Sequence, residues 1–181
     1  MTTLQIILII LGSLITLFFL IAFFLPSSKT LYRSITIERP PDEIYNLVTD
    51  FSNYKKWNPW SAREPEAKGE MRGEQGKVGH KWIWEGKKIG KGYLEIKELE
   101  KGKSVRSDLI FSAPRKMTAE DIWKFEKVDE NSTRVTWGHY SLLGYPVERY
   151  FGLYLDKMLG PDFEQGLMNL KQLSESQESN E

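Results

Sequence analysis

The stretch from Arg33 to Trp60 reads RSITIERPPDEIYNLVTDFSNYKKWNPW, and its succession of local signals decides the fold. Polar residues alternate with Ile35 and Ile37, which is the period of a half-buried strand, so we predict a strand from Leu31 to Glu38. Two consecutive prolines end that strand. The acidic residues directly after them favour a helix N-terminus, and apolar residues then recur at helical spacing, which predicts a short helix closing near Asp50.

The segment from Ser52 to Trp60 is interrupted by Pro59 and is rich in aromatic residues. Proline argues against a long helix, and the aromatic rings argue against a free loop. We therefore expect a brief second helix followed by a packed turn. An alternative is that this segment presents a surface to a protein partner, although packing within the domain is the simpler interpretation.

Beyond Ser61 the pattern changes to successive strands separated by turn residues, as in an antiparallel meander. The predicted strands run Glu66 to Arg72, Val78 to Glu85, Gly90 to Leu99, Ser104 to Phe111, Met117 to Phe125 and Thr133 to Tyr140. Two helical runs follow: Val147 to Leu159, and a second that begins at Pro161, because proline suits the first position of a helix. The residues from Ser174 onward are small and polar, so 175–181 is predicted to be a disordered tail.

The N-terminal segment from Leu4 to Leu25 carries no charged residue. At about 1.5 Å per residue it is long enough to cross the roughly 30 Å hydrocarbon core of a bilayer. The alternative, a cleaved signal peptide, would have an apolar region of about 7 to 15 residues, basic residues before it and small residues at the cleavage site. None of these three features is present. We therefore predict a retained single-pass transmembrane anchor at 1–26 and one soluble domain at 27–174.

The cations that flank this apolar segment bear on its orientation. Lys29, Arg33 and Arg39 follow it, whereas only the terminal amine precedes it. Cytoplasmic flanks of membrane helices are enriched in Lys and Arg, so the soluble domain is predicted to face the cytoplasm. Acidic residues nearby weaken the charge difference, and an exported domain remains the alternative.

The composition excludes several kinds of function. The chain has 25 basic and 25 acidic residues, so it has no overall field that would attract nucleic acid. It has no cysteine, which excludes disulfides, thiolate metal sites and a cysteine nucleophile. Neither metal-ligand spacing nor a glycine-rich phosphate loop is found, so we predict no metal and no cofactor. Aromatic residues make up 13%, including six Trp, and rings of that size must fill a core or line a pocket.

Several separated motifs occur together in a familiar order. They are the Arg33 to Trp60 stretch, GKVGHKWIWEG from Gly76 to Gly86, STRVTWGHY from Ser132 to Tyr140, and MLGPDFEQGLMNLKQL from Met158 to Leu173. With these motifs the chain resembles the polyketide cyclase/dehydrase-like branch of the SRPBCC superfamily, the proteins of START and birch-pollen-allergen type. The resemblance covers Leu31 to Leu173.

The resemblance implies an α+β helix-grip fold, in which a curved antiparallel sheet of about seven strands surrounds a long C-terminal helix. It also implies a hydrophobic cavity between sheet and helix. Members of the superfamily bind lipids, hormones or aromatic polyketides, and some are enzymes, so the fold indicates where a site lies without indicating its chemistry.

Alternation along the predicted strands places a set of side chains on the face that would point toward the C-terminal helix. That set is Val78, His80, Trp82, Trp84, Leu109, Phe111, Met117, Ala119, Asp121, Trp123, Phe125, Val135, Trp137 and His139. From it we predict ligand contacts by Trp82, Trp84, Leu109, Phe111, Trp123, Trp137 and His139. The alternative is that the rings simply close the core.

The polar members of this face are His80, Asp121 and His139. Asp121 and His139 lie on consecutive strands, so antiparallel pairing would bring them close together. A histidine beside a carboxylate could act as a general base or orient a ligand hydroxyl, although an inward polar pair more often only satisfies itself by hydrogen bonding.

The leading hypothesis is a membrane-anchored binding domain for a hydrophobic small molecule or lipid. The first alternative is an enzyme of the cyclase or dehydratase type that uses this His/Asp pair. The second alternative is a scaffold or effector-sensing module whose interior is filled by its own side chains. Lys87, Lys88 and Lys91 gather near a predicted hairpin end, where they would be solvated or would meet anionic lipid headgroups.

Overall fold

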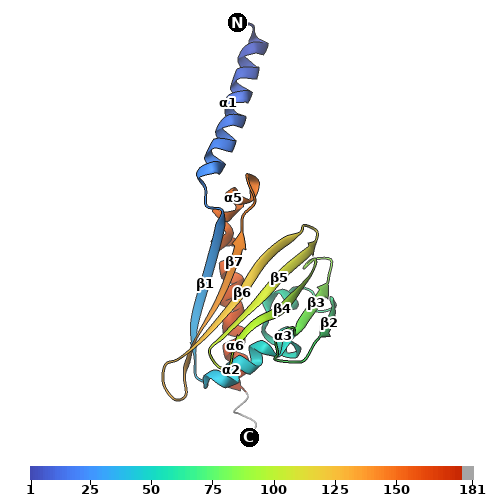
Figure 1. The fold of residues 1–181 in the computed structure, drawn as a ribbon, viewed down its shortest axis with the longest axis vertical. Helices are drawn as coiled ribbons and strands as arrows, with labels where there is room; N and C mark the ends of the chain where they lie inside the picture. The colour runs from blue at the N-terminus through green and yellow to red at the C-terminus, as the bar shows by residue number, and fades with distance from the viewer. Residues whose placement is uncertain (177–181) are drawn as a thin grey trace.

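The computed structural model describes residues 1–176, in which seven antiparallel strands form one sheet and a long helix crosses it (Figure 1). The strands are β1 Ser28–Ile37, β2 Lys68–Arg72, β3 Lys81–Glu85, β4 Lys91–Glu100, β5 Ser104–Ala113, β6 Met117–Lys127 and β7 Thr133–Leu142. The helices are α1 Thr3–Phe24, α2 Pro41–Thr49, η1 Phe51–Asn53, α3 Tyr54–Trp57, α4 Pro59–Arg63, α5 Val147–Gly152 and α6 Leu155–Ser176.

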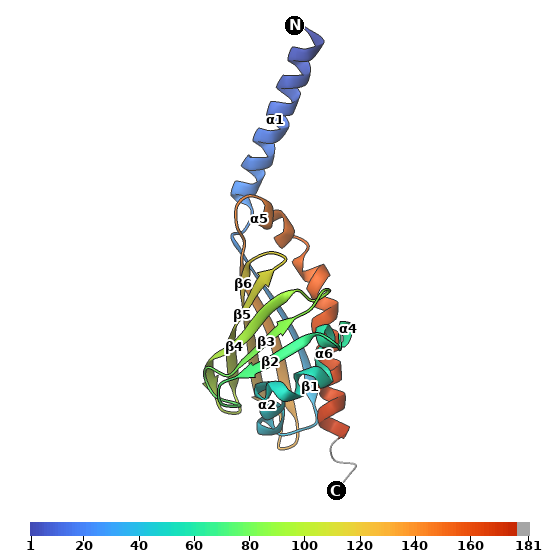
Figure 2. The ribbon, with the colours of Figure 1, turned by 90° about the vertical axis from the view of Figure 1, so that its right-hand side faces the viewer.

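Strands β2 to β7 form a meander, and β1 pairs with β7 as an edge strand. The order across the sheet is β1-β7-β6-β5-β4-β3-β2. It curves around α6, whose buried residues Phe163, Leu167 and Leu170 face it (Figure 2). The α+β helix-grip architecture predicted from the sequence is therefore confirmed.

The register of the strands places one set of strand ends together. Pairings such as Ser28 with Leu142, Phe111 with Met117, and Glu85 with Lys91 bring the starts of β1, β4 and β6 beside the ends of β3, β5 and β7. We name this row of strand ends the α1 edge, because α1 joins β1 there (Figure 1). The name refers to the ends of the strands and not to the outer strands β1 and β2. The opposite edge is covered by α2 and η1, where Ile44, Phe51 and other buried apolar residues form a packed core.

The segment after α2 forms the short helices η1, α3 and α4, in agreement with the short helix and packed turn expected from the sequence. Asp50 accepts a hydrogen bond from the Ser52 amide at the start of η1, and Asn58 accepts from the Trp60 and Ser61 amides at the start of α4. These caps satisfy amides that have no partner within such short helices. The segment packs its aromatic side chains inward.

The strand predicted from Val78 begins later, at Lys81. Gly76 and Gly79 have positive φ values of 68° and 88°, so the chain turns through this region instead of extending. As a result Val78 is 61% exposed, and its predicted place on the inward face is wrong. His80 is still buried, but it lies at the end of the turn.

Pro161 does not begin a helix. It lies inside α6, and the two predicted helical runs are instead the short α5 and the long α6. Proline donates no hydrogen bond to the preceding turn, yet the helix continues because burial of its apolar face against the sheet outweighs that loss. The helix also continues to Ser176, so 175 and 176 do not belong to a tail; residues 177–181 lie outside the described residues.

α1 projects away from the domain as an isolated apolar helix (Figure 1). Its mean hydropathy reaches 3.0, and it is long and apolar enough to cross a membrane. Ala22 is its one buried residue, so α1 does not serve as a core helix of the domain described here.

Candidate functional site

A cavity of about 480 Å³ lies between the sheet and α6. Eight residues that sequence alternation placed on the inward face line it: Trp82, Trp84, Leu109, Phe111, Met117, Asp121, Trp137 and His139. This volume falls within the range of roughly 300 to 1,000 Å³ that is typical of small-molecule sites. The interior is thus not filled by its own side chains.

Sequence reasoning missed the other half of the lining. Those residues come from the short helices (Tyr54, Asn58, Trp60, Arg63), from the β3–β4 turn and β4 (Lys88, Ile89, Leu94) and from α6 (Leu159, Phe163). Leu94 is paired with both Trp82 and Leu109, so pairing the predicted strands in register would have found it. The residues of the short helices and α6 carry no such signal, because only the packing of these helices over the sheet brings them to the cavity.

The cavity opens at the α1 edge. Its exposed lining residues, Arg63, Lys88 and Met117, lie on α4, the β3–β4 turn and the first residue of β6. The buried lining residues lie deeper, toward the middle of the sheet. Opposite this opening, the packed core beneath α2 closes the interior.

Three tryptophans pack together at the inner side of the cavity, and of these Trp137 lines it. The rings of Trp123 and Trp137 stack with centroids 4.6 Å apart, and Trp57 meets both edge-on at 5.6 and 5.5 Å. Trp137 also packs on Phe163 of α6 at 4.3 Å. Trp123 lies behind Trp137 and does not line the cavity, so its predicted contact with a ligand is wrong, and its place is in the core.

Asp121 is held between these tryptophans. Its Oδ2 accepts a hydrogen bond from Trp123 Nε1 at 2.7 Å, and its Oδ1 accepts one from Trp137 Nε1 at 2.5 Å. Burial raises the pKa of Asp121 to about 6, against the opposing effect of the two indole N–H groups. The carboxyl group therefore anchors the aromatic wall, and both of its oxygens are already engaged.

His139 pairs directly with Asp121 across β6 and β7, as the sequence suggested. Burial lowers the pKa of His139 to about 4, so the ring is neutral at pH 7. Within residues 1–176 its ring nitrogens have no hydrogen-bond partner, and the ring lines the cavity beside Phe163. A neutral imidazole in this position offers one donor and one acceptor to a bound molecule.

His80 does not join this pair. Its ring stacks on Phe51 at 4.7 Å, and Nδ1 lies 3.3 Å from the carbonyl oxygen of Thr49, beneath α2 and outside the cavity. The prediction that His80 faces the cavity is therefore wrong. Across residues 1–176 no group of three or more His, Asp or Glu side chains is placed to hold a metal ion.

Comparison with known proteins places the chain among proteins with related folds. The family described as polyketide cyclase/dehydrase and lipid transport matches residues 28–175. No curated protein matches. This match and the solved structures below confirm the resemblance to the SRPBCC superfamily, and they support a ligand-binding domain.

Two of the similar solved structures are enzymes. The Zhui aromatase/cyclase from Streptomyces sp. R1128 has a TM-score of 0.60 at 15% identity, covering 82% of this chain and 94% of its own. Norcoclaurine synthase from Thalictrum flavum has a TM-score of 0.62 at 12% identity, covering 83% and 96%. A protein from Thermobifida fusca has a TM-score of 0.61 at 18% identity, covering 80% and 92%. At such identities these structures share the fold alone with this chain.

Proposed function

The chain belongs to the polyketide cyclase/dehydrase and lipid-transport family, and from that premise we propose that it binds a hydrophobic small molecule or lipid in its cavity while α1 anchors it to a membrane. The observation that carries the proposal is the open cavity of about 480 Å³ with a mainly aromatic and aliphatic lining. An apolar occupant would remove the apolar lining from contact with water, which favours binding, and large rings provide wide contact areas.

The polar groups of the cavity are few, which suits a ligand that is mostly apolar with one polar end. His139 supplies a free donor and acceptor on the inner wall, and Arg63 and Lys88 supply cations at the opening. The polar end of an amphiphile such as a fatty acid would contact either His139 on the inner wall or the two cations at the opening. The exposed apolar helix α1 supports retention at a membrane, where such molecules concentrate.

Filling part of the cavity should weaken binding. Replacing Leu109 by Trp adds a ring to the lining, whereas the same change at Ile110, which follows it on β5 and does not line the cavity, adds a ring elsewhere. We expect L109W to weaken binding of a dansyl-labelled fatty acid at least about tenfold, because the ligand and the new ring compete for one space. The I110W control should bind as the unchanged protein does.

The measurement is a fluorescence titration of the full-length protein in mild detergent, with unfolding curves to show that both variants fold. Equal affinity in folded L109W and I110W would contradict the cavity as the binding site. Native mass spectrometry of the unchanged protein would identify a co-purified ligand.

A cyclase or dehydratase activity is the second candidate, and the direct pairing of Asp121 with His139 at the cavity wall favours it. His139 would accept the proton, since both Asp121 oxygens are engaged by indole N–H groups. Conversion of the co-purified molecule during incubation would favour the enzyme, and its recovery unchanged would favour binding.

A further inference from the structure

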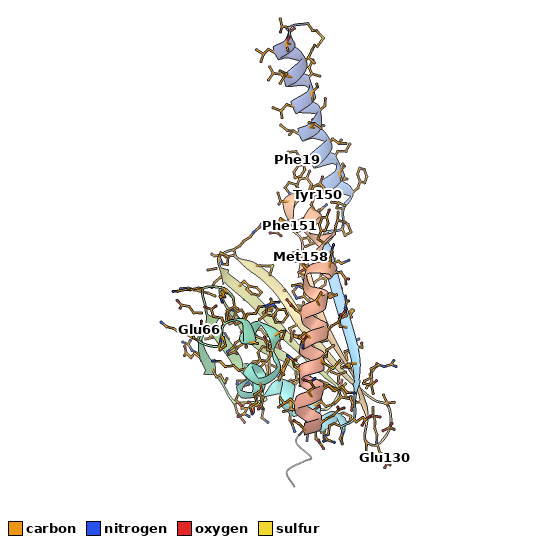
Figure 3. All side chains as sticks on the ribbon, turned by 180° about the vertical axis from the view of Figure 1, so that it is seen from behind. Phe19, Glu66, Glu130, Tyr150, Phe151 and Met158 are labelled. Carbon is orange, nitrogen blue, oxygen red and sulfur yellow. The ribbon has the colours of Figure 1, made fainter. Side chains whose placement is uncertain are left out.

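The α1 edge carries a group of exposed apolar side chains on α5, on the turn after it and at the start of α6. Phe151, Leu153, Tyr154 and Met158 are between 55% and 61% exposed, and Val147 is 46% exposed. We name these five residues the α5 patch; Figure 3 shows Phe151 and Met158 near the lower end of α1. Contiguous exposed apolar residues of this kind mark a surface that contacts something less polar than water.

α5 lies at the C-terminal end of α1 (Figure 1), and tyrosine side chains of α5 and of the turn before it reach back along α1. Tyr150 Oη donates to the carbonyl oxygen of Phe18 at 2.6 Å, and the rings of the two residues stack with centroids 4.8 Å apart. Tyr145 Oη donates to the carbonyl oxygen of Phe19 at 2.9 Å. The contacts therefore reach well back along α1 from its last residue, Phe24.

Arg149 binds the end of the same helix. Its Nη1 lies 3.1 Å from the carbonyl oxygens of both Ala22 and Phe23. These carbonyls belong to the last turn of α1, where helical partners are missing and where a cation is favoured by the helix dipole. The side chain thus fixes α5 to α1 by a contact that suits the boundary between lipid and water.

The depth of the Tyr150 side chain follows from these contacts. Phe18 precedes Phe24 by six residues, so the Tyr150 hydroxyl touches α1 at about 9 Å from its C-terminal end at 1.5 Å per residue. If α1 crosses the bilayer, its length nearly equals the hydrocarbon thickness, and that level lies below the headgroups. Helices that lie in the membrane interface bury their apolar faces to about 5 to 10 Å.

We propose that the α5 patch inserts into the leaflet next to α1 and holds the opening of the cavity against the bilayer surface. The proposal rests on the membrane anchoring and ligand binding proposed above, and it adds the route by which the ligand arrives. An apolar molecule would pass between the bilayer and the cavity without crossing water.

The α5 patch and the cavity opening are physically continuous. Met158 of the patch is followed by Leu159, which lines the cavity. An ion pair between Arg115 and Glu148 at 2.5 Å ties the β5–β6 turn to α5. The exposed Lys87, Lys88 and Lys116 lie on turns of the same edge, where they would face anionic headgroups.

The absence of native cysteine makes depth measurable by single-cysteine spin labels in full-length protein reconstituted into vesicles containing anionic phospholipid. The labelled variants are F151C in the patch, L14C in α1 and V128C, an exposed apolar residue at the opposite edge. We expect the labels at 14 and 151 to collide with oxygen dissolved in the bilayer and not with a water-soluble nickel complex. The label at 128 should do the reverse.

The spin-label results distinguish a failure of the proposed insertion of the α5 patch from a failure of the proposed membrane anchor. A label at 151 that is reached by nickel while the label at 14 is not would overturn the insertion of α5 and leave the anchor intact. A label at 14 that is reached by nickel would overturn the anchor itself. A label at 151 shielded from both reagents would show that another protein surface covers the patch, which also overturns the proposal.

The route of the ligand is tested by the rate of transfer. The double variant F151S/L153S keeps α1 and the cavity, so its affinity for dansyl-labelled fatty acid in detergent should be unchanged. Transfer of that fatty acid from vesicles should slow about tenfold or more, since the opening is no longer held at the bilayer. V128S is the matched control, and transfer at the unchanged rate in F151S/L153S would overturn the route.

Discussion

At the scale of single residues, Asp121 and His139 have environments that shift their pKa values in opposite directions. Burial raises the pKa of Asp121 to about 6 and lowers that of His139 to about 4. Both shifts disfavour the charged form, although the side chains are neighbours in the sheet. The cavity wall is therefore a region that resists charge, as a site for an apolar ligand requires.

The two shifts predict opposing dependences of stability on pH. The raised pKa of Asp121 contributes stability that is complete below about pH 4 and is lost as pH rises through 6. The lowered pKa of His139 contributes stability that is present above about pH 6.5 and is lost as pH falls through 4. The two contributions largely offset each other in the unchanged protein.

Asp121→Asn should remove the contribution of Asp121, so that the pH dependence of stability caused by His139 can be measured. Because one pKa unit corresponds to about 1.4 kcal/mol, the free energy of unfolding of this variant should fall by up to about 3 kcal/mol from pH 7 to pH 4. His139→Asn should show the opposite slope over the same interval. Both slopes are measured by denaturant unfolding in detergent, followed by tryptophan fluorescence. Parallel pH profiles of the two variants would contradict the assigned pKa shifts.

At the scale of elements, the β3–β4 turn forms one side of the cavity opening and is held by Glu64, directly after α4. Glu64 Oε1 accepts a hydrogen bond from the Lys87 amide at 2.8 Å, and Oε2 accepts from the amides of Lys88 and Ile89 at 2.8 and 3.2 Å. These N–H groups lower the pKa of Glu64. The turn is thereby tied to the helices over the cavity.

Glu64→Gln should loosen this turn, because a carboxamide places an N–H group where an acceptor is needed. Hydrogen exchange of the amides at 87–89 should rise on the order of tenfold, and ligand dissociation should quicken. Glu66→Gln is the matched control, since Glu66 is exposed and close in sequence (Figure 3). If exchange at 87–89 rises equally in both variants, Glu64 does not hold the turn.

At the scale of the whole molecule, the cations near the C-terminal end of α1 would favour a cytoplasmic domain if α1 crosses a membrane as proposed. Lys29 follows the helix in sequence, and Arg149 is brought to the same level by the fold. Arg33 contributes less, because it is paired with Asp156 and Glu164 of α6. Folding therefore adds Arg149 to the cations that flank α1, and it neutralises Arg33.

Sidedness is measured by cysteine labelling in intact cells. A cysteine at Val128 should react with a membrane-impermeant maleimide only after permeabilisation, whereas a cysteine at Thr3 should react before it. Thr3 begins α1 and Val128 follows β6, and the start of α1 and the β6–β7 turn lie at opposite ends of the molecule (Figure 1). The reverse pattern would place the domain outside the cytoplasm.

The sequence by itself determined most of the strands, the apolar N-terminal helix and the closeness of Asp121 and His139, because alternation and apolar runs are set by local geometry. It indicated that Trp123 faces inward, but it did not reveal that Trp123 lies behind Trp137, nor the turn before Lys81 or the helix that continues through Pro161. Tyr54, Trp60 and Phe163 reach the cavity only through helices packed over the sheet. A cavity is the space left after distant segments have packed, so its lining and its opening toward α1 were decided by tertiary structure alone.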